Sequence, residues 1–276
     1  MTDSAGKNLV HGENSHLDLY KGDEFTDIHC HCLSGLDDGP HTMAESIELC
    51  RMLVSEGITT VVATPHQLGR FDASNEAGQV RQAVRDLTAV LEENHIPLEI
   101  VPGAEVRVDE RICRLLEADR VLTLADSGRY VLLEIPHEIF IDVEPLLVEL
   151  SIMGVGSIMA HAERIATLSA RPSVLLRWLA HGTHLQITAS SLSGHFGPYL
   201  QRAAWGLLSS GWVSLVATDT HDLNVRRPRM KAAFESIRAK LGDDLAHLVC
   251  IENPSRAITG EDILPALIPD QQETTR

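Results

Sequence analysis

Short apolar runs rich in Val, Ile and Thr alternate with longer stretches of helical periodicity between residues 25 and 266. The apolar runs predict seven strands, at 26–31, 58–64, 98–101, 130–135, 155–161, 184–188 and 213–218. The longer stretches predict helices near 42–56, 75–94, 109–118, 142–153, 172–181, 197–210 and 228–241. This alternation is typical of βα units and of a largely parallel sheet. Seven units in roughly 240 residues predict a distorted TIM-like (β/α)7 barrel.

The two ends of the chain lack this pattern. Residues 1–24 are polar and without periodicity, which predicts a mobile N-terminal arm whose role stays open. Residues 267–276 form a similar polar tail. Since residues 25–266 contain no linker or shift in composition, the sequence predicts that they form a single domain.

Composition excludes several classes of protein. The formal net charge is −16 and there is no basic block, which argues against nucleic acid as a partner, because binding phosphate backbones needs clustered Lys and Arg. No apolar run is long enough for a membrane span, so membrane insertion is not expected. Five cysteines, an odd number, do not form a disulfide framework and favour a reducing cytoplasm. The oligomeric state is left open, and the 14 histidines remain to be explained.

Titratable side chains gather where the predicted strands end. Six of the seven strands end in or run directly into such residues: His29 and His31, His66, Glu105, Glu134, His161, and Asp219 with His221. The carboxyl ends of parallel strands meet at one face of a barrel, so these side chains are expected in a common pocket. A single such histidine is more often a packing residue. The whole cluster would be costly without cations, which predicts a metal site.

The spacing within the first strand fits this interpretation. Residues i and i+2 of a strand share a face, so His29 and His31 can hold one ion together while Cys30 and Cys32 point the other way. The mixed imidazole and carboxylate set suits Mn²⁺, Fe or Zn²⁺ rather than Ca²⁺ or a structural zinc cluster. Asp37 and Asp38 lie in the turn that follows. They either start the helix at 42 or add carboxylate ligands.

The ordered series of motifs resembles the PHP superfamily of metal-dependent phosphoesterases, named for polymerase and histidinol phosphatase. Within it, the chain is most similar to the CpsB-type bacterial tyrosine-protein phosphatases of capsule and exopolysaccharide loci. The resemblance rests on DIHCHCLSGLDDGP (27–40), EGITTVVATPH (56–66), GAEVR (103–107), LLEIP (132–136), AHAER (160–164), QITASSLSGHFG (186–197), ATDTH (217–221) and ENPSRAITG (252–260).

The resemblance implies a PHP-type barrel with up to three divalent ions, Mn²⁺ above all, with Fe, Co or Zn as alternatives. The implied ligand sets are His29, His31, Glu105 and Asp219 for the first ion; Glu105, Glu134 and His161 for the second; and Asp38, His66 and His221 around the third. Arg164 and Arg226 match phosphate-binding positions, as suits the planar guanidinium.

The implied activity is manganese-dependent protein-tyrosine phosphatase activity by direct attack of a metal-bound hydroxide. His221 or a metal-bound water would protonate the leaving group. The implied protein substrate is a phosphorylated bacterial tyrosine autokinase that controls capsule or exopolysaccharide synthesis.

Other interpretations remain beside this one. The same site could hydrolyse a small phosphomonoester such as histidinol phosphate, or the fold could serve as a non-catalytic binding module.

Cys250 and Arg256 form the C-x5-R spacing of cysteine-dependent phosphatases, but Pro254 and Glu252 do not suit a phosphate loop, which indicates coincidence. Residues 191–197 either contact phosphate through backbone amides or cap the helix at 197.

Overall fold

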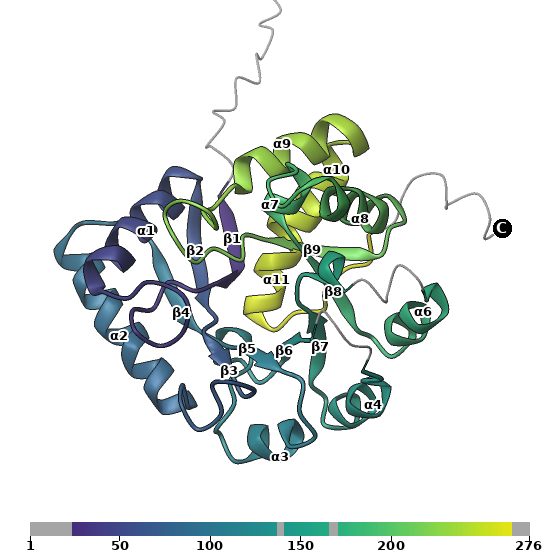
Figure 1. Cartoon of the computed structure of the whole chain (residues 1–276), viewed down its shortest axis with the longest axis horizontal. Helices are drawn as coiled ribbons and strands as arrows, with labels where there is room; N and C mark the ends of the chain where they lie inside the picture. The colour runs from purple at the N-terminus through teal and green to yellow at the C-terminus, as the bar shows by residue number, and fades with distance from the viewer. Residues whose placement is uncertain (1–23, 137–140, 166–170, 267–276) are drawn as a thin grey trace, which may run out of the picture.

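The computed structural model describes residues 24–136, 141–165 and 171–266 (Figure 1). The predicted arm, apart from Glu24, and the predicted tail lie outside the described residues. The strands are β1 (Phe25–Cys30), β2 (Ile58–Ala63), β3 (His66–Gln67), β4 (Glu99–Pro102), β5 (Glu105–Arg107), β6 (Tyr130–Glu134), β7 (Gly156–Met159), β8 (His184–Thr188) and β9 (Val213–Ala217). The α-helices are α1 (Met43–Ser55), α2 (Ala77–Glu93), α3 (Ile112–Glu117), α4 (Glu144–Ile152), α6 (Pro172–Ala180), α7 (Ala189–Leu192), α8 (Pro198–Ser209), α9 (Met230–Leu241), α10 (Asp243–His247) and α11 (Asn253–Thr259).

The strands described above run parallel in two sheets, ordered β1-β2-β4 and β3-β5-β6-β7-β8-β9. The predicted second strand ends as β2 at Ala63, and the chain continues as β3. The predicted third strand ends as β4 at Pro102, and the chain continues as β5. At both places the chain passes from one sheet to the other. At the break in the second strand, Pro65 has no N–H to donate to a ladder.

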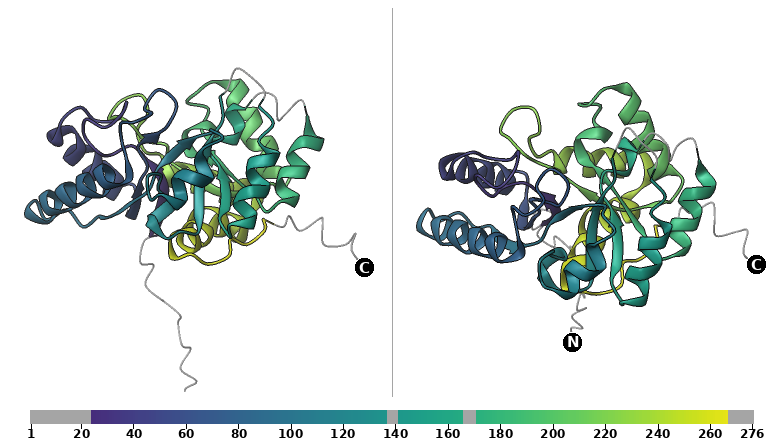
Figure 2. Two further views of the ribbon diagram at one scale, coloured as in Figure 1. Left: turned by 90° about the horizontal axis from the view of Figure 1, so that it is seen from below. Right: turned by 60° about the horizontal axis from the view of Figure 1, so that its bottom comes forward.

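Hydrogen bonds also join the sheets on the opposite side. The backbone N–H of Asp219 donates to the carbonyl of His29 over 2.9 Å, and that of His31 donates to Thr220 over 2.8 Å. The predicted parallel α/β fold is confirmed. These contacts close it into a distorted ring of seven strand positions with helices outside (Figures 1 and 2).

The helices cover the ring through their apolar faces. α1 begins after Thr42, whose side chain accepts a hydrogen bond from the Glu45 N–H, so this cap rather than Asp37 or Asp38 starts the helix. α2 buries Val80, Val84, Leu87 and Leu91 along one face, the spacing expected for an amphipathic helix. α1 and α2 lie side by side on one flank of the ring (Figure 1).

A second apolar cluster fills the inside of the ring. Ile28, Val62, Leu132, Ile158 and Leu215 come from five different strands and are at most 1% exposed. α11 adds Ala257 to this cluster. Hydrogen bonds join the segment around α11 to the beginnings of β9 and β6. The Asn253 amide donates to the carbonyl of Ser214, and the N–H of Ile263 donates to the Tyr130 hydroxyl. α11 therefore covers the end of the ring at which the strands begin.

The chain's last helices were not predicted from the sequence. α10, a π-helical turn at Leu248–Glu252 and α11 follow one another, with Pro254 in the first turn of α11, where proline is tolerated. Within the described parts of the chain, no helix has both the length and the hydropathy to cross a bilayer.

Candidate metal centre

The open end of the ring brings together all the residues that the sequence predicts as metal ligands. They are His29 of β1, His31 after β1, Asp38 of the following turn, His66 of β3, Glu105 of β5, Glu134 of β6, His161 after β7, and Asp219 and His221 after β9. Their ligand atoms fall into overlapping groups whose members lie within 4.8 Å of one another.

Glu105 lies at the middle of the cluster. Its Oε2 is 3.2 Å from Nε2 of His29 and 3.3 Å from Nε2 of His31, and its Oε1 is 2.7 Å from Nε2 of His161. Nδ1 of His66 lies 3.1 Å from Oε2. A carboxylate contacted by imidazoles through both oxygens has the geometry to bridge two cations.

The two histidines of the HxH motif point into the same space. Their Nε2 atoms are 3.3 Å apart. Oδ1 of Asp219 lies 3.5 Å from Nε2 of His29 and 3.9 Å from Nε2 of His31. Cys30 and Cys32 point into the hydrophobic core, as predicted. All five cysteines are free thiols.

A further group lies nearer the surface. Oδ1 of Asp38 is 3.3 Å from Nε2 of His66 and 3.5 Å from Nε2 of His221, and His31 completes the group. Asp38 is 40% exposed, whereas the histidine of β1 is fully buried, so the cluster runs from the interior to the surface.

The spatial groups differ in detail from the implied ligand sets. The resemblance places Glu134 and His161 on one ion. In the structure Glu134 groups with His66 and Glu105, whereas His161 groups with His29 and Glu105. The two groups share Glu105, the carboxylate that the resemblance treats as the bridge.

Two of these residues adopt a backbone conformation that side chains rarely take. His161 has φ 33° and Asp219 has φ 52°, both in the left-handed region, directly after β7 and β9. Such conformations cost energy and persist where the surrounding structure imposes them. They turn both side chains toward the cluster, where each contacts His29 or its partner Glu105.

The sequence did not predict two positioning roles: Asp37 was considered only as a helix start or a ligand, and Gln186 was not considered. Asp37 accepts a hydrogen bond from Nδ1 of His31 over 2.6 Å and another from the N–H of His66 over 3.0 Å. Burial disfavours charge on both partners of the first pair, but their mutual attraction dominates: the pKa of His31 rises to about 10 and that of Asp37 falls to about 2. Gln186 of β8 accepts from Nδ1 of His29 and from the N–H of His161.

Burial and neighbouring charge set the other pKa values in the cluster. Burial opposes the ionisation of Glu105 and Asp219, but neighbouring positive charge outweighs it. Facing histidines hold the pKa of Glu105 well below its usual range, and arginines together with histidines do the same for the pKa of Asp219. Burial lowers the pKa of His161 to about 4 against the pull of Glu105, and burial together with His31 lowers that of His221 to about 4. Against the effect of burial, Glu105 and Asp219 instead raise the pKa of His29. Ionised carboxylates and neutral imidazoles are the forms that bind cations, so His29 and His31 would release protons on binding a metal.

Arginines line the cavity above the cluster. Arg164 and Arg226 each place a guanidinium nitrogen 2.6 Å from an oxygen of Asp219, and Arg107 lies 2.9 Å from Oε1 of Glu134. All three line a cavity of about 380 Å³ together with Asp38, His66, Leu68, Gly69, Arg70, Phe71, Glu105, Glu134 and His161. The cavity is therefore cationic at its sides and carboxylate-rich at its floor.

The residues fit a multinuclear metal centre. Imidazole nitrogens and carboxylate oxygens converge from six strand ends, and the innermost acceptors, Glu105 and Asp219, are each 1% exposed. A pocket of this kind, with histidines oriented by Asp37 and Gln186, has both the ligands and the supporting hydrogen bonds of a metal site.

The remaining sequence candidates do not belong to the groups of potential ligands. Cys250 is fully buried in the π-helical turn, burial raises the pKa of its thiol, and Arg256 lies in α11, so the C-x5-R spacing does not form a phosphate loop. Gly197 precedes α8, in agreement with the capping alternative, and the Ser191 hydroxyl donates to Glu163.

Fold and site together define a parallel (β/α)7 barrel with a cluster of histidines and carboxylates, a candidate metal centre, at its open end. The sequence profile of the family "Capsular polysaccharide synthesis, CpsB/CapC" matches residues 25–259. The chain belongs to this family.

Named relatives agree with this assignment. The chain is 33% identical over 224 residues to the tyrosine-protein phosphatase YwqE of Bacillus subtilis, an alignment that covers 81% of this chain and 87% of YwqE. It is 28% identical over 239 residues to the tyrosine-protein phosphatase CpsB of Streptococcus pneumoniae, covering 84% and 97%.

A solved structure has the same fold. A chain from the crystal structures of YwqE from B. subtilis and CpsB from S. pneumoniae, described as unique metal-dependent tyrosine phosphatases, superposes with a TM-score of 0.82 at 32% identity. The superposition covers 87% of this chain and 96% of that chain.

Proposed function

We propose that this protein is a metal-dependent protein-tyrosine phosphatase. The observation that carries the proposal is the convergence of nine histidine and carboxylate residues at one end of the barrel, in a family whose relatives carry that name. The small-molecule alternative, a histidinol-phosphate type of phosphatase, is not favoured, because the relatives that cover most of this chain are named as tyrosine-protein phosphatases.

The proposed ligands are the nine residues of the cluster, with Glu105 as the shared carboxylate. Mn²⁺ is the proposed ion, as the resemblance to the PHP superfamily implies, and the carboxylate and imidazole set without thiolate is compatible with it, as it is with Fe or Zn. Bound divalent ions would supply a water nucleophile near neutral pH and neutralise charge on the phosphate.

The arginines and His221 have separate proposed roles. Arg164 and Arg226 would bind the non-bridging phosphate oxygens, since each guanidinium presents paired donors at the cavity wall. In the reaction, a water oxygen forms a bond to phosphorus, the bond from phosphorus to the phenolic oxygen breaks, and a proton reaches the leaving phenolate. His221 is proposed as a ligand only, because its pKa, lowered to about 4, leaves the imidazole neutral near pH 7. The other donor that the sequence analysis offers, a water at the metal centre, is therefore the proposed source of this proton.

The proposed protein substrate is a phosphorylated bacterial tyrosine autokinase that controls capsule or exopolysaccharide synthesis. The family description names capsular polysaccharide synthesis, and the tyrosine-phosphatase names of the relatives supply the phosphorylated residue. A cytoplasmic site of action stays a prediction from cysteine usage.

The proposal is tested with a phosphotyrosine peptide and histidinol phosphate as competing substrates. The protein is stripped by chelation, and Mn²⁺, Fe²⁺, Co²⁺ or Zn²⁺ is added back singly. We expect phosphotyrosine hydrolysis to disappear on stripping and to return most fully with Mn²⁺. Hydrolysis that survives complete metal removal, or a clear preference for histidinol phosphate, would contradict it.

A further inference from the structure

The cavity above the proposed metal centre has one apolar wall. Among the described residues that line it, the apolar side chains are Leu68 and Phe71, and both belong to the segment 68–76 between β3 and α2. Most of the other lining residues are charged side chains or histidines. An organic group attached to a phosphate on the cavity floor would meet its apolar surface here.

Phe71 is held in a defined orientation at this wall. Its ring stacks on the imidazole of His66, with 5.4 Å between centroids and 7° between planes. The guanidinium of Arg70 lies over the Phe71 ring, 4.7 Å from its centroid, and also bonds to Oδ2 of Asp38 over 2.8 Å. A ring edge and a guanidinium plane are both favourable contacts for another aromatic ring.

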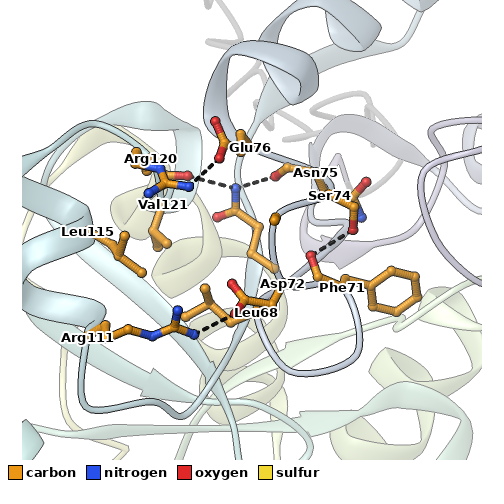
Figure 3. Close-up of a pocket in the computed structure, with 12 residues that line it drawn as sticks. Leu68, Phe71, Asp72, Ser74, Asn75, Glu76, Arg111, Leu115, Arg120 and Val121 are labelled. Atoms are coloured by element: carbon orange, nitrogen blue, oxygen red, sulfur yellow. Dashed lines mark hydrogen bonds and ion pairs between the residues drawn. The ribbon is translucent and has the colours of Figure 1, made fainter.

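Polar contacts on the other side of the segment hold it in place. Arg111 bonds to Asp72 over 2.9 Å, and Arg120 pairs with Glu76 (Figure 3). The Asn75 amide donates to the His66 carbonyl over 2.9 Å. In Figure 3 the Phe71 ring points to the side opposite both arginines. A small pocket of about 40 Å³ lies beside these contacts and shares Leu68 and Phe71 with the cavity above the proposed metal centre. An anchored wall loses little conformational freedom when a ligand binds.

We propose that Phe71 is a specificity-determining residue that selects aryl over alkyl phosphates by contact with the aromatic ring of the substrate. The inference rests on the proposed phosphatase function and deepens it. The phosphate would be held by the metal centre and arginines, which accept any phosphomonoester. Preference for a phenyl group would come from the wall that Phe71 forms.

Two uncleaved ligands separate these contributions. Phenylphosphonate and methylphosphonate share the anionic head, and only the first carries an aromatic ring. Their dissociation constants for the Mn²⁺-loaded protein are measured by calorimetry. In Phe71→Leu, we expect binding of phenylphosphonate to weaken by about 2- to 12-fold, the range of one aromatic pair. Methylphosphonate binding should stay constant, and Phe71→Tyr should restore selectivity.

Phe196 provides the matched control. The guanidinium of Arg164 lies over its ring at 5.1 Å, but Phe196 is not among the residues that line the cavity. Phe196→Leu should therefore change binding of both phosphonates by the same factor, if at all. Equal changes for both ligands in Phe71→Leu, no change for either, or no binding of phenylphosphonate by the unaltered protein would overturn the inference.

The anchoring contacts give a second comparison. Asp72→Ala removes the ion pair with Arg111, whereas Asp119→Ala removes an ion pair with Arg81 that does not involve segment 68–76. We expect a selective loss of phenylphosphonate binding in the first variant and none in the second.

If the unaltered protein hydrolyses phosphotyrosine while selectivity does not depend on Phe71, this inference alone fails. If it hydrolyses no phosphomonoester with any metal, the proposed function fails.

Discussion

His31 donates a hydrogen bond from Nδ1 to Oδ2 of Asp37 over 2.6 Å. The bond orients the ring so that Nε2 is directed at Glu105, 3.3 Å away, and it keeps the Nδ1 proton when a bound cation displaces the one on Nε2. Carboxylates that orient metal-binding histidines in this way raise the basicity of the ligand. Asp37 therefore acts on the proposed centre through His31, as a positioning residue.

Replacing this carboxylate should weaken metal binding without unfolding the protein. In Asp37→Asn we expect Mn²⁺ affinity to fall about 10- to 100-fold, the usual effect of losing such a partner. Titration against a competing chelating dye measures it. Asp86→Asn, an exposed change on α2, is the control and should retain full affinity. Unchanged affinity in Asp37→Asn would rule out the positioning role.

Metal-centred and cysteine-centred hydrolysis predict opposite mutational results. His29→Ala removes an imidazole at the centre of the cluster and should lower phosphotyrosine turnover by about 100-fold or more, since such ions contribute several kcal/mol. Cys250→Ala, in a fully buried position, should retain turnover. Circular dichroism checks that both variants fold. Loss of activity in the cysteine variant with retention in His29→Ala would refute the metal mechanism.

The sequence predicted the candidate metal ligands because their positions follow from local rules. His29 and His31 share a strand face through their spacing, and the other candidate ligands lie at strand ends, which meet in any parallel barrel. The same rules gave the strands and the long helices. The points at which the chain passes from one sheet to the other, at Pro65 and Gly103, follow no periodic pattern. Pro65 has no N–H to donate, and an added Cβ at Gly103 would lie 2.5 Å from a side-chain carbon of Val62.

Gln186 shows why the remainder was missed. It lies 157 residues from His29, and only the closed ring brings its amide oxygen within 3.1 Å of that imidazole. Its one signal in the sequence was a polar residue facing inward within an apolar strand. Phe71 is similar, because its stacking on His66 depends on the shape of segment 68–76 rather than on any periodic pattern.

Metal binding should stabilise the folded protein. An ion that binds only the native state at about 100 times its Kd adds about 2.7 kcal/mol, which corresponds to a rise in Tm of about 5–11 °C for a domain of this size. Differential scanning fluorimetry of stripped protein with and without Mn²⁺ measures the shift. Cys250→Ala should show the full shift. Glu105→Gln should show much less, because Glu105 contacts four of the clustered histidines. Equal shifts in both variants would argue that Mn²⁺ binds elsewhere.

His184 should make stability depend on pH independently of the metal centre. Burial lowers its pKa to about 4, only partly opposed by Asp262, in a site where its ring meets the edge of Tyr130. The unfolded chain binds a proton near pH 6.5, whereas the folded chain does so only near 4, so stability falls as pH drops from 6.5 to 4. The side chain is partly exposed, which reduces the expected loss to about 1–2 kcal/mol. Urea unfolding of the stripped protein at pH 7 and 4.5 measures the total loss, to which His161 and His221 also contribute. The His184 share is the amount by which His184→Gln loses less. A variant with the same pH dependence as the unaltered protein would show that His184 does not contribute.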